Sequence, residues 1–429
     1  KLISLTENFN LNRRMLAVET VLTDNLPRRL MFLAWGSPWP AHSGGALRTF
    51  GLLREISKSF EVEIVVLTPQ RLSNEQTAVL KDYSTTIIQV PQKNVTFQEK
   101  FQVCGRMIKL RLPYHCAILD RSFQNCPHVL HKILNYPGVV YASYGHWGTL
   151  VHNKMSPNWI LDQHNADVDF WRVYASQVSN PLVKLAALMN WWLCAKHFRR
   201  IYHHVGCIVS VCEEDKQLTL ALAPNAKVNV IQNGVDCSYY FPARKTRIDR
   251  KPRLLFTGTS AARNVFALNK FVHNILPLIQ RKIPDVELLV AGNFHGKVQS
   301  QFRKVQNIRF TGRVDDIRPF FNQSDVYVAP FNKTHGSKLK IAEAMAMGMA
   351  IVSTPEGIRG FPLVDGESVL VAYSDEQFAS YVVYLLNDPV MRKKVGEEAR
   401  KVVETFIDWQ VLGKRLVQII NSVYEGISK

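Results

Sequence analysis

The fold class is decided by residues 29–69, RLMFLAWGSPWPAHSGGALRTFGLLREISKSFEVEIVVLTP. The segments 29–36 and 61–69 are predicted to be strands, and the second is a β-branched run without room for a helical period, which indicates a buried strand. A glycine-containing loop and the helical pattern of residues 46–60 lie between them. Strand, loop, helix and strand in this order predict the βαβ unit of a parallel sheet. We therefore predict a doubly wound α/β fold for this half of the chain.

The same alternation continues along the chain and restarts once. Five further strands are predicted in the first half, at residues 85–90, 138–143, 159–163, 206–212 and 228–232. The polar, basic segment 233–252 (NGVDCSYYFPARKTRIDRKP) is the best linker, and six more strands follow it, at residues 253–258, 286–292, 307–312, 325–330, 350–354 and 368–372. A chain of 429 residues also exceeds what one core supports. We predict two Rossmann-like domains, residues 1–240 and 241–429, with a ligand in the cleft between them.

The charge of the chain is strongly basic. Lys and Arg number 53 against 35 acidic residues, a formal net charge of +18. This surplus favours an anionic partner, which is a nucleic acid, a phosphate-bearing ligand or an anionic membrane face. It is also consistent with a basic surface that only keeps the protein soluble. The net charge alone therefore does not distinguish these partners from one another or from a solvated surface.

The cysteines and the apolar runs of the sequence indicate in which cell compartment the protein lies. The seven cysteines are spaced as singles, and an odd number argues against a disulfide framework. No uninterrupted apolar run of 18 residues occurs, and the first residues, KLISLTENFNLNRR, do not resemble a signal peptide. We predict reduced cysteines and a cytoplasmic protein, with the inner face of the membrane as a candidate peripheral location.

Glycines follow the first strand of each predicted domain. Gly44 and Gly45 precede a helix that carries Arg48, and a backbone without side chains lets an anion approach the start of a helix. A flexible turn is the alternative interpretation. In the second half, Gly258 ends a strand and Arg263 follows in the next loop.

The stretch THGSKLKIAEAMAMGMAIVST, residues 334–354, carries charges in an apolar setting. Lys338 and Lys340 lie where a helix is predicted to begin, and their positive charge is unfavourable there unless an anion binds. A solvated lysine pair is the alternative. Glu343 lies among small apolar residues, so its carboxylate must be paired or bound to a polar group. A ribose would supply two hydroxyl groups to it, which together with a phosphate at Lys340 indicates a nucleotide.

Residues 339–360, LKIAEAMAMGMAIVSTPEGIRG, resemble the nucleotide-sugar-binding signature of the retaining glycosyltransferases of family 4. The agreement extends to VIQNGVDCSYYFP (230–242) and, more loosely, to about residues 29–420. The resemblance implies the GT-B architecture, in which two Rossmann-like domains face each other. The N-terminal domain would bind the acceptor and the C-terminal domain the nucleotide sugar, and the last helix is a candidate to cross back to the N-terminal domain.

The resemblance also implies roles in the C-terminal domain. Glu343 corresponds to the ribose ligand, and Lys340 to a lysine at the diphosphate. His335 stands where many members have the first glutamate of a Glu-x7-Glu pair, next to the donor sugar. Arg263 and Asn264 stand in place of the usual arginine and lysine at the diphosphate.

In the N-terminal domain, Gly44 and Gly45 fall where the family's glycine loop meets the diphosphate. His164, in LDQHNAD, falls where many members have a histidine near the donor sugar. His146, in YGHWG, is the rival for that role.

We therefore predict a retaining transferase that moves a sugar from a nucleoside diphosphate sugar, UDP- or GDP-linked, to a glycan, a lipid-linked glycan or another small acceptor. The donor is a substrate, and no cofactor is predicted. No His, Cys and Asp cluster has the spacing of metal ligands, and VDDIR (314–318) is interpreted as structural, so the reaction is predicted to be metal-independent.

Two basic segments with interleaved apolar residues, 181–204 and 99–115, leave a choice open. They either lie on an anionic membrane or pack their tryptophans inside and expose a solvated basic edge. Three other functions also stay open. These are a sugar-nucleotide epimerase of the same fold, a catalytically silent binding homologue with His335 in place of the glutamate, and a nucleic-acid-binding protein. The last lacks a zinc or RNA-recognition motif, so no nucleic acid partner is predicted.

Overall fold

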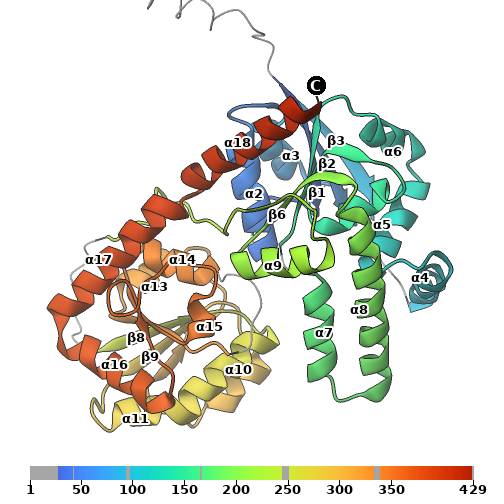
Figure 1. Cartoon of the computed structure of the whole chain (residues 1–429). Coiled ribbons are helices and arrows are strands. Elements are labelled where there is room, and N and C mark those ends of the chain that lie inside the picture. Colours follow the sequence, from blue (N-terminus) through green and yellow to red (C-terminus); the bar gives the residue numbers. More distant parts are fainter. Residues whose placement is uncertain are drawn as a thin grey trace, which may run out of the picture.

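The computed structural model describes residues 28–41, 43–92, 97–164, 167–243, 251–332 and 339–427. These residues form two α/β domains, each built on a parallel sheet that helices cover (Figure 1). The chain alternates between strand and helix as predicted, and the doubly wound α/β class is confirmed.

The N-terminal sheet has seven strands in the order β3-β2-β1-β4-β5-β6-β7. Their bounds are β1 (Arg29–Trp35), β2 (Glu61–Thr68), β3 (Thr86–Pro91), β4 (Val139–Ser143), β5 (Ser156–Asp162), β6 (Val205–Ser210) and β7 (Val228–Val230). Both faces of the sheet are buried. Phe32 of β1 belongs to one apolar core, and its neighbours Met31 and Leu33 belong to the other. The near-continuous apolar runs follow from this double burial.

Helices and short 3-10 turns connect these strands. They are α2 (Gly44–Ile56), α3 (Asn74–Lys81), α4 (Phe97–Leu110), α5 (Tyr114–Gln124), α6 (Pro127–Leu134), the 3-10 segment η1 (Gly145–Val151), α7 (Asp167–Gln177), α8 (Pro181–Ile201) and α9 (Glu213–Leu222). Ser43 caps α2, since its side chain accepts a hydrogen bond from the Ala46 amide at 3.2 Å.

The C-terminal sheet has six strands in the order β10-β9-β8-β11-β12-β13. They are β8 (Arg253–Thr257), β9 (Glu287–Ala291), β10 (Ile308–Phe310), β11 (Val326–Ala329), β12 (Ala350–Ser353) and β13 (Leu370–Val371). In both sheets the strand order reverses beside the first strand, and ligands of such sheets bind at the carboxyl ends of the strands at this point.

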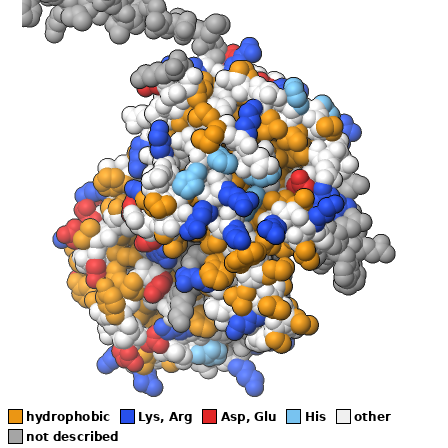
Figure 2. Space-filling view, turned by 45° about the vertical axis from the view of Figure 1, so that its right-hand side comes forward, with side chains coloured by type: hydrophobic (Ala, Val, Ile, Leu, Met, Phe, Trp, Pro, Cys, Tyr) orange, Lys and Arg blue, Asp and Glu red, His pale blue; other side chains and the backbone are white. Residues whose placement is uncertain are grey.

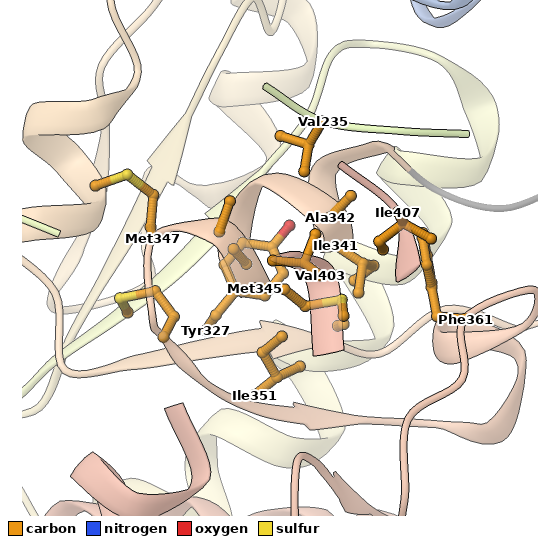
Figure 3. Packing of buried hydrophobic residues seen from close by; sticks show 14 of the residues in the cluster. Val235, Tyr327, Ile341, Ala342, Met345, Met347, Ile351, Phe361, Val403 and Ile407 are labelled. Carbon is orange, nitrogen blue, oxygen red and sulfur yellow. The ribbon is translucent and has the colours of Figure 1, made fainter. Parts of the chain in front are cut away.

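The helices of the C-terminal domain include the one predicted to carry Lys340 and Glu343. The elements are α10 (Ala262–Lys270), η2 (Phe271–Ile275), α11 (Leu276–Gln280), α12 (Gly296–Gln299), η3 (Ser300–Phe302), α13 (Arg318–Asn322), α14 (Leu339–Ala346), α15 (Pro355–Ile358), α16 (Asp375–Asn387), α17 (Pro389–Phe406) and α18 (Trp409–Ile427). Figure 3 shows the buried face of α14, where Ile341 and Met345 lie among Tyr327, Ile351 and Val403.

The chain crosses between the domains twice, and the two crossings are hydrogen-bonded to each other. The amide of Val235 donates to the Ile407 carbonyl group at 3.1 Å, and the Trp409 amide donates to the Val235 carbonyl group at 3.1 Å. After the second crossing α18 packs on α2 of the N-terminal domain (Figure 1). A Cβ at Gly51 would lie 2.5 Å from the Trp409 ring, so glycine permits this close approach.

The thirteen predicted strands correspond to the seven and six strands of the two sheets. The predicted boundary at residues 240 and 241 lies in the segment between β7 and β8. The cysteines that the structure describes with their side chains are free thiols. Across the described ranges, none of the helices combines the length and the apolar character that a membrane crossing requires.

Candidate functional site

The predicted site residues of the two domains meet where α2 and α14 begin. A Cβ at Gly44 would contact the Leu339 side chain at 3.4 Å, so the first residues of these helices are neighbours across the domain boundary. α2 follows β1, and α14 follows β11 after the intervening loop. Both helices therefore start at the carboxyl edge of their sheet, beside the point where the strand order reverses.

A buried ion pair supports the N-terminal side of this region. The Arg48 guanidinium donates to the Asp162 carboxylate in a fork, from Nε to Oδ2 at 2.9 Å and from Nη2 to Oδ1 at 2.5 Å. Both side chains are almost wholly buried, with 1% and 0% exposed. Arg48 also donates to the carbonyl groups of Ile231 and Gln232 at 2.9 and 3.0 Å. Arg48 therefore joins α2, β5 and the first interdomain crossing, and is not available to an anion at the start of α2.

The charge of Asp162 is stabilised inside the protein. Burial acts to raise the pKa of its carboxyl group, but the charge of Arg48 and the hydrogen bond and charge of His164 outweigh burial and hold the pKa well below its usual range. For Arg48, burial acts to lower the pKa, and Asp162 outweighs it in the opposite direction. The pair is therefore charged at neutral pH.

His164 lies directly beyond β5 and against this pair. Its Nε2 atom is 3.3 Å from Asp162 Oδ2, and its ring lies on the Tyr144 ring with centroids 3.8 Å apart. Tyr144 has a backbone φ of 142°, an uncommon value for a residue with a side chain. A Cβ at Gly45 would collide with the Tyr144 hydroxyl group and lie 3.3 Å from His164 Nδ1. Gly45 thus makes room for the Tyr144 and His164 side chains at the start of α2.

His146, the rival histidine, lies at the same edge of the sheet and is buried. Burial, and after it the charge of His164, lowers the pKa of His146 to about 4, so its ring is neutral at neutral pH. The centroid of its ring is 4.8 Å from the His115 ring and 5.8 Å from the Trp35 ring. The Trp171 ring also adjoins His115, with ring centroids 6.3 Å apart. The structure places both predicted histidines together and adds Trp35, His115 and Trp171 as an aromatic wall that the sequence did not indicate.

On the C-terminal side, Lys340 is partly buried and donates hydrogen bonds to two neutral groups. Its Nζ atom donates to the Thr257 carbonyl group at 3.1 Å and to Asn264 Oδ1 at 2.8 Å. It also lies 5.0 Å from the centroid of the Phe331 ring. The alternative of a solvated lysine is therefore wrong for Lys340. Its amine lies at the carboxyl end of β8, beside α10.

Glu343 follows Lys340 by one turn of α14 and is half-buried. Its Oε1 atom accepts a hydrogen bond from the Tyr240 hydroxyl group at 3.2 Å, which supplies the polar partner that the sequence required. Burial raises the pKa of Glu343, while the hydrogen bond from Tyr240 and the charge of Lys340 act against that rise. An ionised carboxylate has about four acceptor positions, so one hydroxyl partner leaves capacity for others.

The remaining predicted residues of this side differ in where they point. A Cβ at Gly258 would lie 3.2 Å from the side chains of Asn264 and Phe294, so this glycine permits close packing of β8 against α10. Asn264 is buried and holds Lys340, whereas Arg263 lies on the exposed side of α10. Of this pair, Asn264 is the one that contacts Lys340. His335 and Lys338 lie outside the described residues.

VDDIR is tied into the protein by side-chain contacts. Arg318 donates to Asp316 at 2.8 Å and lies 3.9 Å above the Tyr239 ring, next to Tyr240 of the site. Among the residues that the structure describes, no three His, Cys, Asp or Glu side chains are grouped in a way that could hold a metal ion.

The C-terminal domain is similar to a known family of proteins. Residues 251–388 match the family of glycosyl transferases group 1, which confirms the predicted resemblance. A GDP-mannose-dependent monoacylated alpha-(1-6)-phosphatidylinositol monomannoside mannosyltransferase of Corynebacterium glutamicum is 24% identical over 54% of this chain and 67% of that protein. Phosphatidyl-myo-inositol mannosyltransferase of Mycobacterium tuberculosis is 30% identical over 45% of this chain. The match to it spans only 53% of that relative's length. The names of both relatives agree with the predicted enzyme class.

Solved structures show the same two-domain fold. Sucrose-phosphate synthase from Thermosynechococcus elongatus superposes with a TM-score of 0.67 at 14% identity, covering 93% of this chain and 100% of that one. A putative UDP-N-acetylglucosamine 2-epimerase from Listeria monocytogenes superposes with a TM-score of 0.57 at 14% identity, covering 93% and 97%. The GT-B architecture is confirmed, and it is shared by transferases and an epimerase, so the fold alone does not choose between these reactions.

Proposed function

We propose that this chain, which carries a group 1 glycosyl transferase domain, transfers a sugar from a nucleoside diphosphate sugar to a glycan or lipid-linked acceptor. One observation carries the proposal. Lys340 and Glu343 lie one turn apart on α14, where this helix begins against α2 of the other domain, and they are hydrogen-bonded to the Thr257 carbonyl group and the Tyr240 hydroxyl group. A cation and a carboxylate at this spacing suit the diphosphate and the ribose of one nucleotide.

In this proposal the C-terminal domain holds the nucleotide. Glu343 accepts hydrogen bonds from the two ribose hydroxyl groups, and Tyr240 fixes its orientation. Lys340 stabilises the negative charge that develops on the leaving diphosphate, and Asn264 holds the amine in place. Lys338, Arg263 and the backbone at Gly258 are further candidates for phosphate contacts.

The N-terminal domain then faces the donor sugar. His164 hydrogen-bonds a sugar hydroxyl group, and Asp162 orients the imidazole ring from a distance of 3.3 Å. The backbone at Gly44 and Gly45 approaches the diphosphate from this side, and His335 is a further candidate for a contact to the sugar. The sugar is transferred with retention at its anomeric carbon and without a metal ion.

The aromatic wall of Trp35, His115 and Trp171 is the proposed acceptor surface. Trp35 and His115 adjoin His146, and Trp171 adjoins His115. Trp35 ends β1, at the same edge of the sheet as His164 beyond β5. Flat aromatic faces suit the apolar faces of sugar rings, and their polar edges suit hydroxyl groups. The two relatives are named for mannose transfer to phosphatidylinositol lipids, which supports a lipid-linked sugar as the first acceptor to test.

A thermal-shift screen of UDP-, GDP-, ADP- and TDP-sugars tests the proposal, because a ligand that binds only the folded protein raises the melting temperature. GDP-mannose is the first donor to try, since one relative is named as dependent on it. The stabilising donor is then incubated alone and with acceptors. Release of nucleoside diphosphate supports a transferase, a converted but intact nucleotide sugar indicates an epimerase, and binding without either indicates a silent homologue. The absence of a shift with every donor contradicts the proposal.

A cytoplasmic location, peripheral on the inner membrane face, also remains our proposal. It accords with the basic charge of the chain and with an acceptor embedded in lipid.

A further inference from the structure

Helix α8 carries an apolar stripe that faces solvent. Leu182, Leu185, Met189 and Trp192 are 76%, 66%, 41% and 49% exposed. They are spaced by three, four and three residues, which places their side chains along one side of the helix. By contrast, the outer face of an ordinary surface helix is polar.

The opposite side of α8 is already used for packing. Ala187, Asn190, Cys194, His197 and Ile201 recur at spacings of three and four residues and are buried. Asn190 accepts a hydrogen bond from the Tyr114 amide at 2.8 Å, and His197 is hydrogen-bonded to Thr149 at 3.1 Å. α8 therefore has two apolar sides, and the protein covers one of them. The two tryptophans behave differently, since Trp191 is partly buried and Trp192 is exposed.

Positively charged side chains follow the exposed apolar stripe along α8. Lys196 and Arg199 continue it at the next helical positions, and the Lys196 amine lies 4.3 Å from the centroid of the Trp192 ring. Residues 181–201 contain neither Asp nor Glu. About 21 Å separate Leu182 from Lys196 along the helix axis, at the usual rise per residue. The surface is apolar at one end and cationic at the other.

A second segment of the same character ends beside α8. Ile108 and Leu110, at the end of α4, are 71% and 44% exposed, and Lys109 between them is exposed. The chain then reaches Tyr114, whose amide is bonded to α8. Figure 1 shows α7 and α8 side by side, extending from the N-terminal domain, with α4 next to them. Figure 2 shows hydrophobic side chains gathered on this side of the molecule, with Lys and Arg side chains beside them.

We propose that α8 and the end of α4 dock on an anionic lipid surface, with the apolar stripe at the acyl boundary and the cations at the headgroups. Leucine and tryptophan with flanking lysine and arginine are the side chains that an interfacial helix uses. A second copy of the chain fits less well, because α8 offers no acidic side chain and pairing would bring like charges together. This inference goes beyond sugar transfer and does not depend on it, because lipid binding is measured without donor or acceptor.

Vesicle flotation with the full chain tests the docking surface. The wild type should float with vesicles of phosphatidylcholine and phosphatidylglycerol, bind phosphatidylcholine alone more weakly, and lose binding as salt is raised. The variant Leu182→Gln/Leu185→Gln should partition into the vesicles at least about tenfold less, because two leucine side chains are no longer transferred from water to the lipid. Val390→Gln is the matched control, since Val390 is 79% exposed but lies in the C-terminal domain, and it should bind as the wild type does.

The charged end of the stripe gives a second, independent variant. Lys196→Glu should weaken binding to anionic vesicles and leave binding to phosphatidylcholine alone unchanged. Lys393→Glu, at an exposed lysine of α17, should change neither. All substituted side chains are largely exposed, so thermal unfolding should remain as in the wild type.

Three results would overturn the inference. The first is a wild type that does not bind anionic vesicles. The second is a leucine variant that binds them as well as the Val390→Gln control does. The third is a wild type that is dimeric in light scattering and becomes monomeric in the leucine variant without a change in vesicle binding, which would assign the stripe to a second copy.

Discussion

The two sides of the candidate site differ in how deeply their charged side chains are buried and in what binds them. In the N-terminal domain, Arg48 and Asp162 neutralise each other and are almost wholly buried. In the C-terminal domain, Lys340 and Glu343 are partly exposed and are held by a carbonyl group, an amide and a phenol. A charge neutralised inside the protein supports the structure, whereas a partly exposed charge can still attract a charged ligand. We therefore assign a supporting role to Arg48 and Asp162 and a binding role to Lys340 and Glu343.

The largest effect is expected where the supporting pair is broken. Asp162→Asn leaves the buried Arg48 guanidinium without its counter-charge and should lower the free energy of unfolding by about 3–5 kcal/mol. Urea unfolding followed by tryptophan fluorescence measures this change. Glu398→Gln, which removes the partner of Lys401 in an exposed pair at 2.7 Å, should cost less than about 1 kcal/mol.

The same pair predicts a pH dependence of stability. Because the pKa of Asp162 is lowered in the folded protein, its contribution is present above the unfolded pKa of about 3.9 and is lost as pH falls from there toward the folded pKa. The difference between the wild type and Asp162→Asn should therefore shrink in acid. A difference that stays constant as pH falls below the unfolded pKa would contradict the ion-pair explanation.

The next largest effect is expected on turnover, from His164 beside the Arg48–Asp162 pair. His164→Ala should lower turnover by about 100-fold or more, while the affinity for free nucleoside diphosphate stays nearly constant because that ligand has no sugar. Steady-state rates and calorimetric titration separate the two quantities. His146→Ala is the comparison, and it should lower turnover much less. If His146→Ala lowers turnover more than His164→Ala does, the catalytic centre lies at the YGHWG loop instead.

The sequence predicted the elements well because strand patterns are local. The runs at residues 29–36 and 61–69 became β1 and β2, since burial on both faces demands apolar residues throughout. It also predicted that Glu343 needs a polar partner. It could not identify that partner, because Tyr240 lies more than a hundred positions away and reaches α14 only through the interdomain crossing.

The missed residues share this long-range character. Arg48 is separated from Asp162 by 114 positions, so nothing in the local pattern shows that the guanidinium turns inward. Asp162 offered a signal, since it ends a strand at the carboxyl edge and precedes His164. Trp35 offered the same signal at the end of β1. His115 and Trp171 come from helices and join the wall only through packing.

At the proposed nucleotide site, the raised pKa of Glu343 predicts a smaller effect, which is a pH dependence of nucleotide affinity. Only the ionised carboxylate accepts two hydroxyl hydrogen bonds, so the affinity for nucleoside diphosphate should fall as pH decreases through this raised pKa. Glu343→Gln should lack this component and keep only the dependence that comes from the ligand's own phosphates. Identical pH profiles for both proteins would argue against a carboxylate–ribose contact.

The smallest effect is expected from chelation. Addition of EDTA should leave the rate of transfer unchanged, since Lys340 and helix starts are proposed to stabilise the leaving diphosphate. Rates are compared before and after chelation and after addition of magnesium or manganese. Activity that appears only with the added ion would contradict a metal-independent reaction.

Calorimetric titration of the nucleoside diphosphate tests the central assignment most directly, because it reports on the binding side alone. Lys340→Ala and Glu343→Ala should each weaken binding by about 1.5–3 kcal/mol while thermal unfolding changes little. Lys297→Ala, at an exposed lysine of α12, serves as the control and should bind as the wild type does. Unchanged affinity in both α14 variants would contradict the assignment of this helix to the nucleotide.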